Sequence, residues 1–375
     1  MSSISVTRSS MPPLDEYVAE ISSLWDSHWL TNMGVKHREF EAQLRSYLDV
    51  EGVALYTNGH SALECAIEAL QLGADGRYKV ITTPFTFAST THAIARKGLT
   101  PVFADIKLND FTIDPKEIEK LVDDKTCAIL PVHVYGNICD VDSISNIAKR
   151  HNLKVIYDAA HAFGVRTSGD SVAKFGDISM FSFHATKVFN TIEGGALCYR
   201  DCRLSTILNQ WKNFGITGPE SAEYIGGNAK MNEFCAAMGL CNLRHIQEEI
   251  DKRKTVAHCY WRLLESVPGI RACVPPDETE HNYAYLPVVF NGSGTFVRDK
   301  VFEALSKRCI GARKYFYPLT SDLECYRGKF DSNKTPNAKY VANHILTLPM
   351  YADLSLENVE AICHIVKSAI QEGEN

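Results

Sequence analysis

Several features are missing from this sequence, and each absence excludes a class of protein. No two of its twelve cysteines form a C-x-x-C pair, which excludes zinc-ribbon and dithiol redox motifs. No run of 18 apolar residues occurs, so we expect no membrane-spanning helix. The N-terminus lacks an apolar segment with a cleavage pattern, so no secretory leader is expected. We therefore predict a cytoplasmic protein with reduced thiols and no disulfide framework.

Basic residues are not in excess either. The 375 residues include 39 Lys and Arg against 45 Asp and Glu, which gives a formal net charge of −6. Because non-specific nucleic-acid binding depends on a positive surface, a nucleic-acid partner is disfavoured. Hydrophobic residues make up 45% of the chain and charged residues 22%, which is the usual composition of a globular protein with a large core.

The first half of the chain alternates between two kinds of pattern. Between residues 50 and 200, short apolar runs such as 53–56 and 155–157 predict buried strands, and segments such as 60–72 have the period of a helix. This alternation predicts an α/β fold with a mostly parallel sheet and helices on both faces. In such sheets ligands bind beyond the carboxyl ends of the strands.

The pattern changes after residue 200. A long helix is predicted over 233–264, and a polar, glycine-rich loop around 214–228 precedes it. The strands and helices that follow are typical of a smaller α+β unit. We expect a large cofactor-binding domain over 1–245 and a small C-terminal domain over 246–375.

Polar and aromatic residues collect where the predicted strands end. Gly59 opens a strand-to-helix turn whose backbone N–H groups could bind a phosphate, although many such glycines only form the turn. Phe87 could stack on a planar ring or simply be a core residue. Asp158 ends the strand 155–157, where a carboxylate either caps a helix or requires a partner such as a cationic ring nitrogen.

Lys187 follows another apolar strand and stands among aromatic residues. Most lysines extend into water, so this position alone would carry little weight. A lysine shielded from water can instead attack a carbonyl carbon. Together with a phosphate-binding turn, an aromatic platform and a carboxylate for a ring nitrogen, Lys187 completes the contacts that pyridoxal 5′-phosphate (PLP) requires. PLP is the predicted cofactor, and no metal site is predicted.

The order and spacing of these motifs resemble those of the DegT/StrS-type sugar-nucleotide aminotransferases, a branch of the fold type I PLP-dependent transferases. The motifs that carry the resemblance are 57–63, 84–90, 158–164, 182–187, 212–215 and 228–233. The resemblance spans nearly the whole chain. It implies a large domain with a mostly parallel seven-stranded sheet flanked by helices, followed by a small C-terminal α+β domain.

The resemblance also implies a role for each matched position. Lys187 matches the lysine that bonds to the cofactor aldehyde, Asp158 the partner of the ring nitrogen, and Phe87 the stacked aromatic residue. Asn228 matches an asparagine that reaches the phosphate from a neighbouring subunit, which implies a homodimer with shared active sites. The other residues expected to bind the phosphate are Gly59, His60, Ser61 and Ser182.

Two positions differ from the usual family pattern. Many members have glutamine where His161 stands, and that glutamine bonds the ring hydroxyl. A histidine can do the same, and its protonation could tune the site. Many members also have threonine where His60 stands, so one hydroxyl contact to the phosphate is lost, and backbone N–H groups could compensate for it.

The resemblance implies transfer of an amino group from L-glutamate to a nucleotide-linked keto-sugar. The stretches 182–187 and 193–195 are most similar to those of members that act at C-4 and convert dTDP-4-keto-6-deoxy-D-glucose to dTDP-4-amino-4,6-dideoxy-D-glucose. Candidate contacts to the sugar nucleotide are Thr31, Tyr315 and Tyr317. A cap for the threonine and ordinary packing for the tyrosines explain these three residues equally well.

Four alternatives compete with this interpretation. An aminotransferase acting at C-3 would share the scaffold. A PLP- or pyridoxamine-phosphate-dependent sugar dehydratase is disfavoured, because some such relatives replace the lysine that Lys187 matches with histidine. A non-enzymatic PLP-binding regulator is disfavoured by the absence of a basic DNA-binding appendage. A Rossmann-type dehydrogenase is disfavoured because the first strand is not followed by G-x-G-x-x-G.

Overall fold

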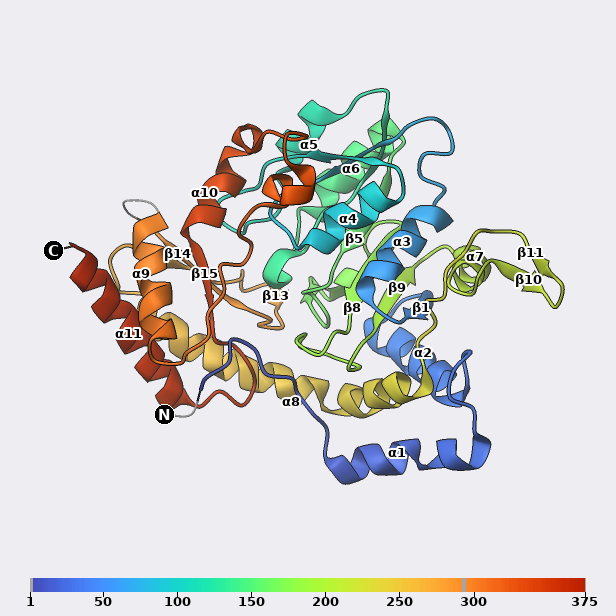
Figure 1. Cartoon of the computed structure of the whole chain (residues 1–375), viewed down its shortest axis with the longest axis horizontal. Coiled ribbons are helices and arrows are strands. Elements are labelled where there is room, and N and C mark those ends of the chain that lie inside the picture. The colour runs from blue at the N-terminus through green and yellow to red at the C-terminus, as the bar shows by residue number, and fades with distance from the viewer. Residues whose placement is uncertain (1–2, 292–294, 375) are drawn as a thin grey trace.

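The computed structural model describes residues 3–291 and 295–374 (Figure 1). No secretory leader was expected at the N-terminus, and residues 1–2 of that segment lie outside the described ranges. A seven-stranded sheet with the order β1-β9-β8-β5-β4-β2-β3 forms the centre. Its strands are β1 (Gly52–Tyr56), β2 (Lys79–Thr82), β3 (Thr100–Phe103), β4 (Thr126–Ile129), β5 (Lys154–Asp158), β8 (Ile178–Ser182) and β9 (Gly195–Tyr199). Only β9 runs antiparallel to its neighbours, so the predicted mostly parallel sheet is confirmed.

Successive side chains of each strand pack into different cores. In β1, Ala54 and Tyr56 join one core, while Val53 and Leu55 join another on the opposite face. One face is covered by α3 (Gly59–Ala69), α4 (Ala88–Arg96) and α7 (Leu204–Trp211). The other face is covered by α2 (Val35–Leu48), α5 (Pro115–Leu121), α6 (Val141–His151) and the first half of α8 (Glu233–Leu264). Burial on both faces explains why these strands are continuous apolar runs.

A smaller α+β unit follows the large one. Its antiparallel sheet has the order β12-β14-β15, formed by β12 (Ile270–Ala272), β14 (Leu286–Phe290) and β15 (Ile345–Leu348). Its helices are α9 (Thr295–Ser306), α10 (Pro336–His344) and α11 (Leu356–Glu374). The boundary expected between residues 245 and 246 falls inside α8, which runs without a break beneath both units (Figure 1).

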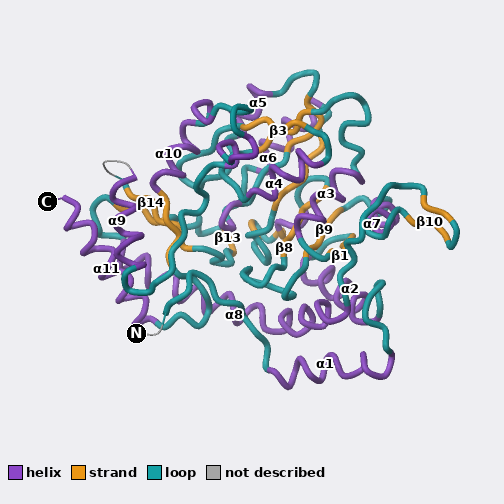
Figure 2. The backbone as a smooth tube through the Cα atoms, viewed as in Figure 1, coloured by secondary structure: helices purple, strands orange, loops and turns teal. Residues whose placement is uncertain are grey.

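Two elements of the large unit, a helix near its N-terminus and a hairpin near its C-terminal end, extend away from its sheet. Helix α1 (Leu14–Ser27) lies along α8, where Arg244 forms ion pairs with Glu16 and Glu20. A hairpin of β10 (Ile216–Gly218) and β11 (Ser221–Ala222) projects from the body of the molecule (Figures 1 and 2). Both features therefore present side chains outside the compact core.

The remaining elements are short connections. A small sheet joins β13 (Thr279–Glu280), β6 (Arg166–Thr167) and β7 (Asp170–Ser171). The 3-10 helices are η1 (Val134–Gly136), η2 (Val172–Lys174), η3 (Thr320–Asp322), η4 (Glu324–Tyr326) and η5 (Ser332–Lys334). All twelve cysteines are free. Within 3–291 and 295–374, no helix combines the length and the apolar character needed to cross a bilayer.

Candidate active site

The carboxyl ends of β1, β2, β5 and β8 surround a cavity of about 510 Å³, where the sheet topology predicts a ligand. Seven of the residues predicted from the sequence line this cavity: Gly59, His60, Phe87, Asp158, His161, Ser182 and Lys187. They come from four separate segments of the chain. Tyr315 also lines the cavity, from the segment that follows the small unit's α9.

The N-terminus of α3 faces this cavity. Asn58 caps the helix, and its side-chain oxygen accepts a hydrogen bond from the backbone N–H of Ser61 at 2.8 Å. Ser61, predicted to bind the phosphate, therefore has its N–H engaged and does not line the cavity. The N–H groups of Gly59 and His60 precede it in the first turn, where helices lack internal acceptors, so they are the donors available to an anion.

A glycine on β9 allows this turn to lie so close to the sheet. A Cβ atom on Gly195 would lie 2.7 Å from the backbone nitrogen of Gly59 and 2.7 Å from the carbonyl carbon of Asn58. Any larger residue at position 195 would displace the start of α3. The glycine thus fixes the position of the N–H groups that face the cavity.

The His60 side chain is held at the rim of the cavity. Its Nδ1 lies 2.9 Å from the Ser89 hydroxyl, and its Nε2 lies 3.3 Å from the Glu64 carboxylate. These contacts occupy both ring nitrogens. The backbone of His60, more than its ring, is thus available to an anion in the cavity.

Asp158 is the buried carboxylate of the site, with 5% of its surface exposed. Its Oδ2 accepts a hydrogen bond from the Thr90 hydroxyl at 2.7 Å, and its Oδ1 accepts one from the Ala160 N–H at 3.1 Å. Burial raises the pKa of Asp158, while the two hydrogen bonds and the charge of Lys187 act in the opposite direction. A cation at the open side of this carboxylate would stabilise its ionised form further.

Lys187 lies in the loop between β8 and β9. Its backbone N–H donates to the His184 carbonyl at 2.9 Å, which forms a tight turn and directs the side chain into the cavity. The ammonium lies 5.9 Å from the centroid of the Tyr285 ring. Among the described residues the side chain makes no hydrogen bond or ion pair, so its amine is available to react.

His161 is a neutral donor in this structure. Its Nδ1 accepts the backbone N–H of Tyr135 at 3.0 Å, so the ring proton is placed on Nε2. Tyr135 has a φ of 59°, a left-handed conformation that turns its N–H toward the imidazole. Burial, assisted by the charge of Lys187, holds the pKa of His161 well below its ordinary value. This shift favours the neutral imidazole, and a role of its protonation in tuning the site stays a prediction.

Aromatic side chains form the outer wall of the cavity. Phe87 is 56% exposed at the mouth, with its ring centroid 6.5 Å from that of Tyr315. Such an exposed ring is not a core residue, which removes the alternative considered for Phe87. Arg313 lines the same wall and was missed in the sequence, because it comes from a distant segment without a local motif.

Three predicted residues lie away from this cavity. Tyr317 is exposed, and its ring packs against the Arg298 guanidinium at 4.9 Å. Thr31 is exposed between α1 and α2, and its carbonyl accepts the Trp29 indole N–H. Asn228 is exposed at the base of the projecting hairpin. A single chain therefore does not bring these three residues to the site.

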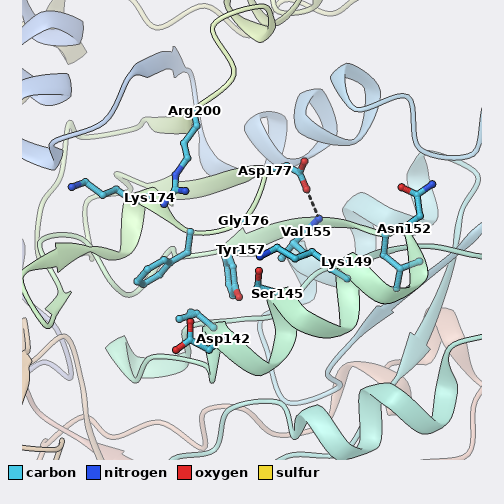
Figure 3. A pocket seen from close by; sticks show the side chains of 14 residues that line it. Asp142, Ser145, Lys149, Asn152, Val155, Tyr157, Lys174, Gly176, Asp177 and Arg200 are labelled. Carbon is cyan, nitrogen blue, oxygen red and sulfur yellow. Dashed lines mark hydrogen bonds between the residues drawn. The ribbon is translucent and has the colours of Figure 1, made fainter.

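A second cavity, of about 660 Å³, lies beside α6 and the start of β5 (Figure 3). Its lining includes exposed charged side chains such as Lys149 and Arg200, and Asp177 accepts the Val155 N–H at 2.8 Å. It lies at the amino end of β5, away from the carboxyl ends of the strands. Its lining contains no carboxylate as buried as Asp158.

The chain resembles known proteins over almost its whole length. Residues 14–367 match the model of the DegT/DnrJ/EryC1/StrS aminotransferase family. Proteins named dTDP-4-amino-4,6-dideoxy-D-glucose transaminase from Shigella dysenteriae and Escherichia coli are 39% and 40% identical to it, each over 97% of this chain and 98% of the relative. The structure of DesI in the presence of its TDP-sugar product has a TM-score of 0.94 at 31% identity, covering 100% of this chain and 95% of that one.

The fold and the cavity together define a transferase of the PLP-dependent fold type I. The chain belongs to the DegT/DnrJ/EryC1/StrS aminotransferase family, and its activity is that of an aminotransferase.

Proposed function

We propose that this aminotransferase uses PLP to transfer the amino group of L-glutamate to C-4 of dTDP-4-keto-6-deoxy-D-glucose, which yields dTDP-4-amino-4,6-dideoxy-D-glucose. The names of the Shigella dysenteriae and Escherichia coli relatives support this product. The observation that carries the proposal is the convergence of Lys187, Asp158 and the N-terminus of α3 on one cavity at the carboxyl edge of the sheet.

The residues of the cavity fit PLP group by group. The free N–H groups of Gly59 and His60 suit a phosphate, and the buried Asp158 suits a protonated ring nitrogen. His161 carries its proton on Nε2 and suits the ring oxygen. Lys187 suits the aldehyde carbon. The remaining contacts would come from Phe87 against the ring and the Ser182 hydroxyl at the phosphate.

When bound, PLP supplies an electron sink for the negative charge that develops on the substrate carbon. The protein's own task is then to move protons and to hold charge. Lys187 Nζ has no competing hydrogen bond among the described residues, so it can remove the proton from the α-carbon of glutamate. In the second half of the reaction the same amine delivers a proton to C-4 of the sugar. Asp158 keeps a negative charge at the buried end of the cavity, and Phe87 shields its mouth from water.

The acceptor is an anionic sugar nucleotide, although the chain carries a net charge of −6. Local cations must therefore attract it. Arg313, together with His92 and His184, lines the outer part of the cavity beside Tyr315. We propose that this wall binds the diphosphate-linked sugar, with Arg313 as the charged contact and Tyr315 as a packing surface.

We also propose that the protein is a homodimer with shared active sites. Large apolar side chains are exposed on α1, on the connection between α1 and α2 and beside the strands of the projecting hairpin, including Trp25, Trp29, Leu30, Phe214 and Ile225. Exposed apolar surface of this extent is typical of a protein interface. A second subunit covering it could bring Asn228 to the phosphate, and Thr31 to the substrate, of the neighbouring cavity.

The experiment is direct. The purified enzyme is incubated with L-glutamate and dTDP-4-keto-6-deoxy-D-glucose, and the sugar product is identified by mass spectrometry and NMR. The proposal predicts an amine at C-4 and one equivalent of 2-oxoglutarate per aminosugar. The 3-keto isomer serves as the matched control. Amination at C-3, or loss of water without an aminosugar, would instead identify the C-3 aminotransferase or the dehydratase.

A further inference from the structure

Two buried hydroxyl groups form a hydrogen-bonded chain that ends on the carboxylate of Asp158. The Thr86 hydroxyl is 2.8 Å from the Thr90 hydroxyl, which is in turn 2.7 Å from Asp158 Oδ2. Thr90 is completely buried on α4 and does not line the cavity. Thr86, almost as buried just before the helix, does line it. Thr90 can therefore influence a bound molecule only through Asp158.

The direction of these hydrogen bonds follows from counting protons. A threonine hydroxyl has one proton, and an ionised carboxylate can only accept. With Asp158 ionised, the Thr90 proton must point to Oδ2, and the Thr90 oxygen is left to accept the proton of Thr86. Both hydroxyl dipoles then point toward the carboxylate, and each strengthens the other in these buried surroundings.

The hydrogen-bonded pair of threonine hydroxyls opposes the effect of burial on the protonation of Asp158. Burial favours the protonated carboxyl, whereas hydrogen bonds to the carboxylate favour the ionised form. Asp158 accepts hydrogen bonds from two protein donors in the described part of the chain, and the Thr90 hydroxyl is the closer, at 2.7 Å against 3.1 Å for the Ala160 N–H. Without Thr90, Oδ2 would lose its protein donor.

We infer that Thr90, supported by Thr86, is a positioning residue that keeps Asp158 ionised and directed toward the cavity. The inference rests on the proposed function, in which Asp158 pairs with the cofactor's ring nitrogen. It also gives a physical reason for hydroxyl residues at positions 86 and 90. Four residues apart at the start of α4, they are close enough for the contact between their hydroxyls.

The neighbouring residue supplies a matched control. Thr91 is buried on the same helix, but its hydroxyl donates to Thr320 at 2.9 Å and has no contact with Asp158. Thr90→Val and Thr91→Val therefore remove the same hydroxyl group from adjacent buried positions. Thr90→Ser retains the donor while removing a methyl group.

Three measurements test the inference on these variants. PLP affinity is measured by titration of the apoprotein, the absorbance of the loaded protein is followed against pH, and turnover is followed against pH. For Thr90→Val we expect PLP affinity to fall about tenfold to a hundredfold, which corresponds to the free energy that a hydrogen bond to a charged group contributes. We expect the acidic limb of both pH profiles to move upward by about one pH unit, because Asp158 would protonate more readily. Thr91→Val and Thr90→Ser should remain close to wild type.

Several outcomes would overturn the inference. It is wrong if Thr90→Val matches Thr91→Val in affinity and pH profile, or if Thr90→Ser is as impaired as Thr90→Val. If Thr90→Val does not fold, Thr86→Val decides, because it retains the Thr90–Asp158 bond and should shift the profile in the same direction by a smaller amount; no shift contradicts the inference. A wild-type protein that does not bind PLP overturns the proposed function as well.

Discussion

At the scale of single residues, some polar side chains of the site have hydrogen-bond partners within the protein, whereas Lys187 has none within the described ranges and is available to react. His161 uses Nδ1 to accept a backbone N–H, and Asp158 has two donors on its buried side. Lys187, in contrast, has only the Tyr285 ring near its ammonium among the described residues. A group without competing partners can react or transfer protons, whereas the satisfied groups hold the geometry.

Lys187→Ala should abolish catalysis. Removal of the group that we propose to move the proton is expected to reduce glutamate-dependent aminosugar formation by about a thousandfold or more. Turnover is measured by following 2-oxoglutarate release. Lys149→Ala, at an exposed lysine of the second cavity, provides the control and should retain full activity. Wild-type turnover by Lys187→Ala would contradict the assignment.

A second residue prediction concerns stability against pH. His37 is buried on α2 with neither ring nitrogen hydrogen-bonded within the described ranges, and burial lowers its pKa to about 3. The unfolded chain binds a proton at His37 below about pH 6.5, whereas the folded protein does not until about pH 3. Stability from this residue is therefore fully present above pH 6.5 and is lost as the pH falls, by about 1.4 kcal/mol per pH unit.

His37→Leu should remove this dependence. We expect urea unfolding of the variant to lose less stability between pH 7.5 and pH 5.5 than wild type does, by about 1–1.5 kcal/mol. His364→Leu, at an exposed histidine of α11, serves as the control and should retain the wild-type slope. Parallel curves for His37→Leu and wild type would show that His37 is protonated in the folded protein.

At the scale of elements, contacts at the N-terminus of one helix help to position the site. Glu233, in the first turn of α8, is fully buried and accepts the N–H groups of Lys36 at 2.8 Å and His37 at 3.3 Å. It thereby caps α2 from another helix. Gly34 makes room for it, because a Cβ there would lie 2.6 Å from the Glu233 carboxylate. Helix α2 in turn packs Phe40 against the loop that carries Lys187.

Glu233→Gln should destabilise this arrangement while leaving its shape intact. The loss of a negative charge at a buried helix N-terminus is expected to cost about 1–2 kcal/mol in the free energy of unfolding. Chemical denaturation measures this change. Glu248→Gln, on the exposed surface of α8, should cost almost nothing, since its ion pair with Lys252 is solvated. Equal stability of the two variants would mean that the negative charge of Glu233 does not contribute to capping α2.

The sequence predicts elements with strong local patterns and misses those formed by tertiary contacts. Helix α8 has the bounds predicted from its period, and the predicted strand at 155–157 lies within β5. Helix α4 begins at Ala88, because Phe85 packs in the core ahead of it, and this tertiary contact sets a start that local sequence does not mark. The cap on α2 joins residues about 200 positions apart, and no local pattern reports it.

The same distinction applies to the candidate site. Motif residues at strand ends were predicted to lie together, and parallel topology brings the ends of β1, β5 and β8 to one edge. Arg313 and the Thr86–Thr90 chain were not predicted, since their roles depend on side-chain directions that a strand-and-helix pattern does not fix. The neutrality of His161 depends on burial, which also becomes known only from the fold.

At the scale of the whole molecule, a single chain leaves part of the expected site outside its cavity. Asn228 is exposed, and its side-chain oxygen is held by the buried Lys230 ammonium at 2.9 Å. Because lysine only donates, the amide nitrogen of Asn228 must point elsewhere, and it has no partner among the described residues. This geometry suits donation to an anion bound by a second subunit.

Trp29→Ser combined with Ile225→Asp should therefore weaken the proposed dimer. Ile225 is 97% exposed on the hairpin, and a charge there would be buried by a second subunit. Light scattering should show a shift toward the monomer, and cofactor affinity should fall with it. Val274→Asp, at another exposed apolar residue that lies on the small unit, is the control. An unchanged dimer in the double variant would place the interface elsewhere.

The continuity of α8 has a consequence for how substrate enters. At 32 residues the helix is about 48 Å long, and it packs beneath both units. Rotation of one unit against the other would bend this helix and break its backbone hydrogen bonds. Opening and closing by domain rotation is thus costly in this architecture. The mouth of the cavity is lined by Phe87 and Tyr315, whose side chains can rotate without bending α8.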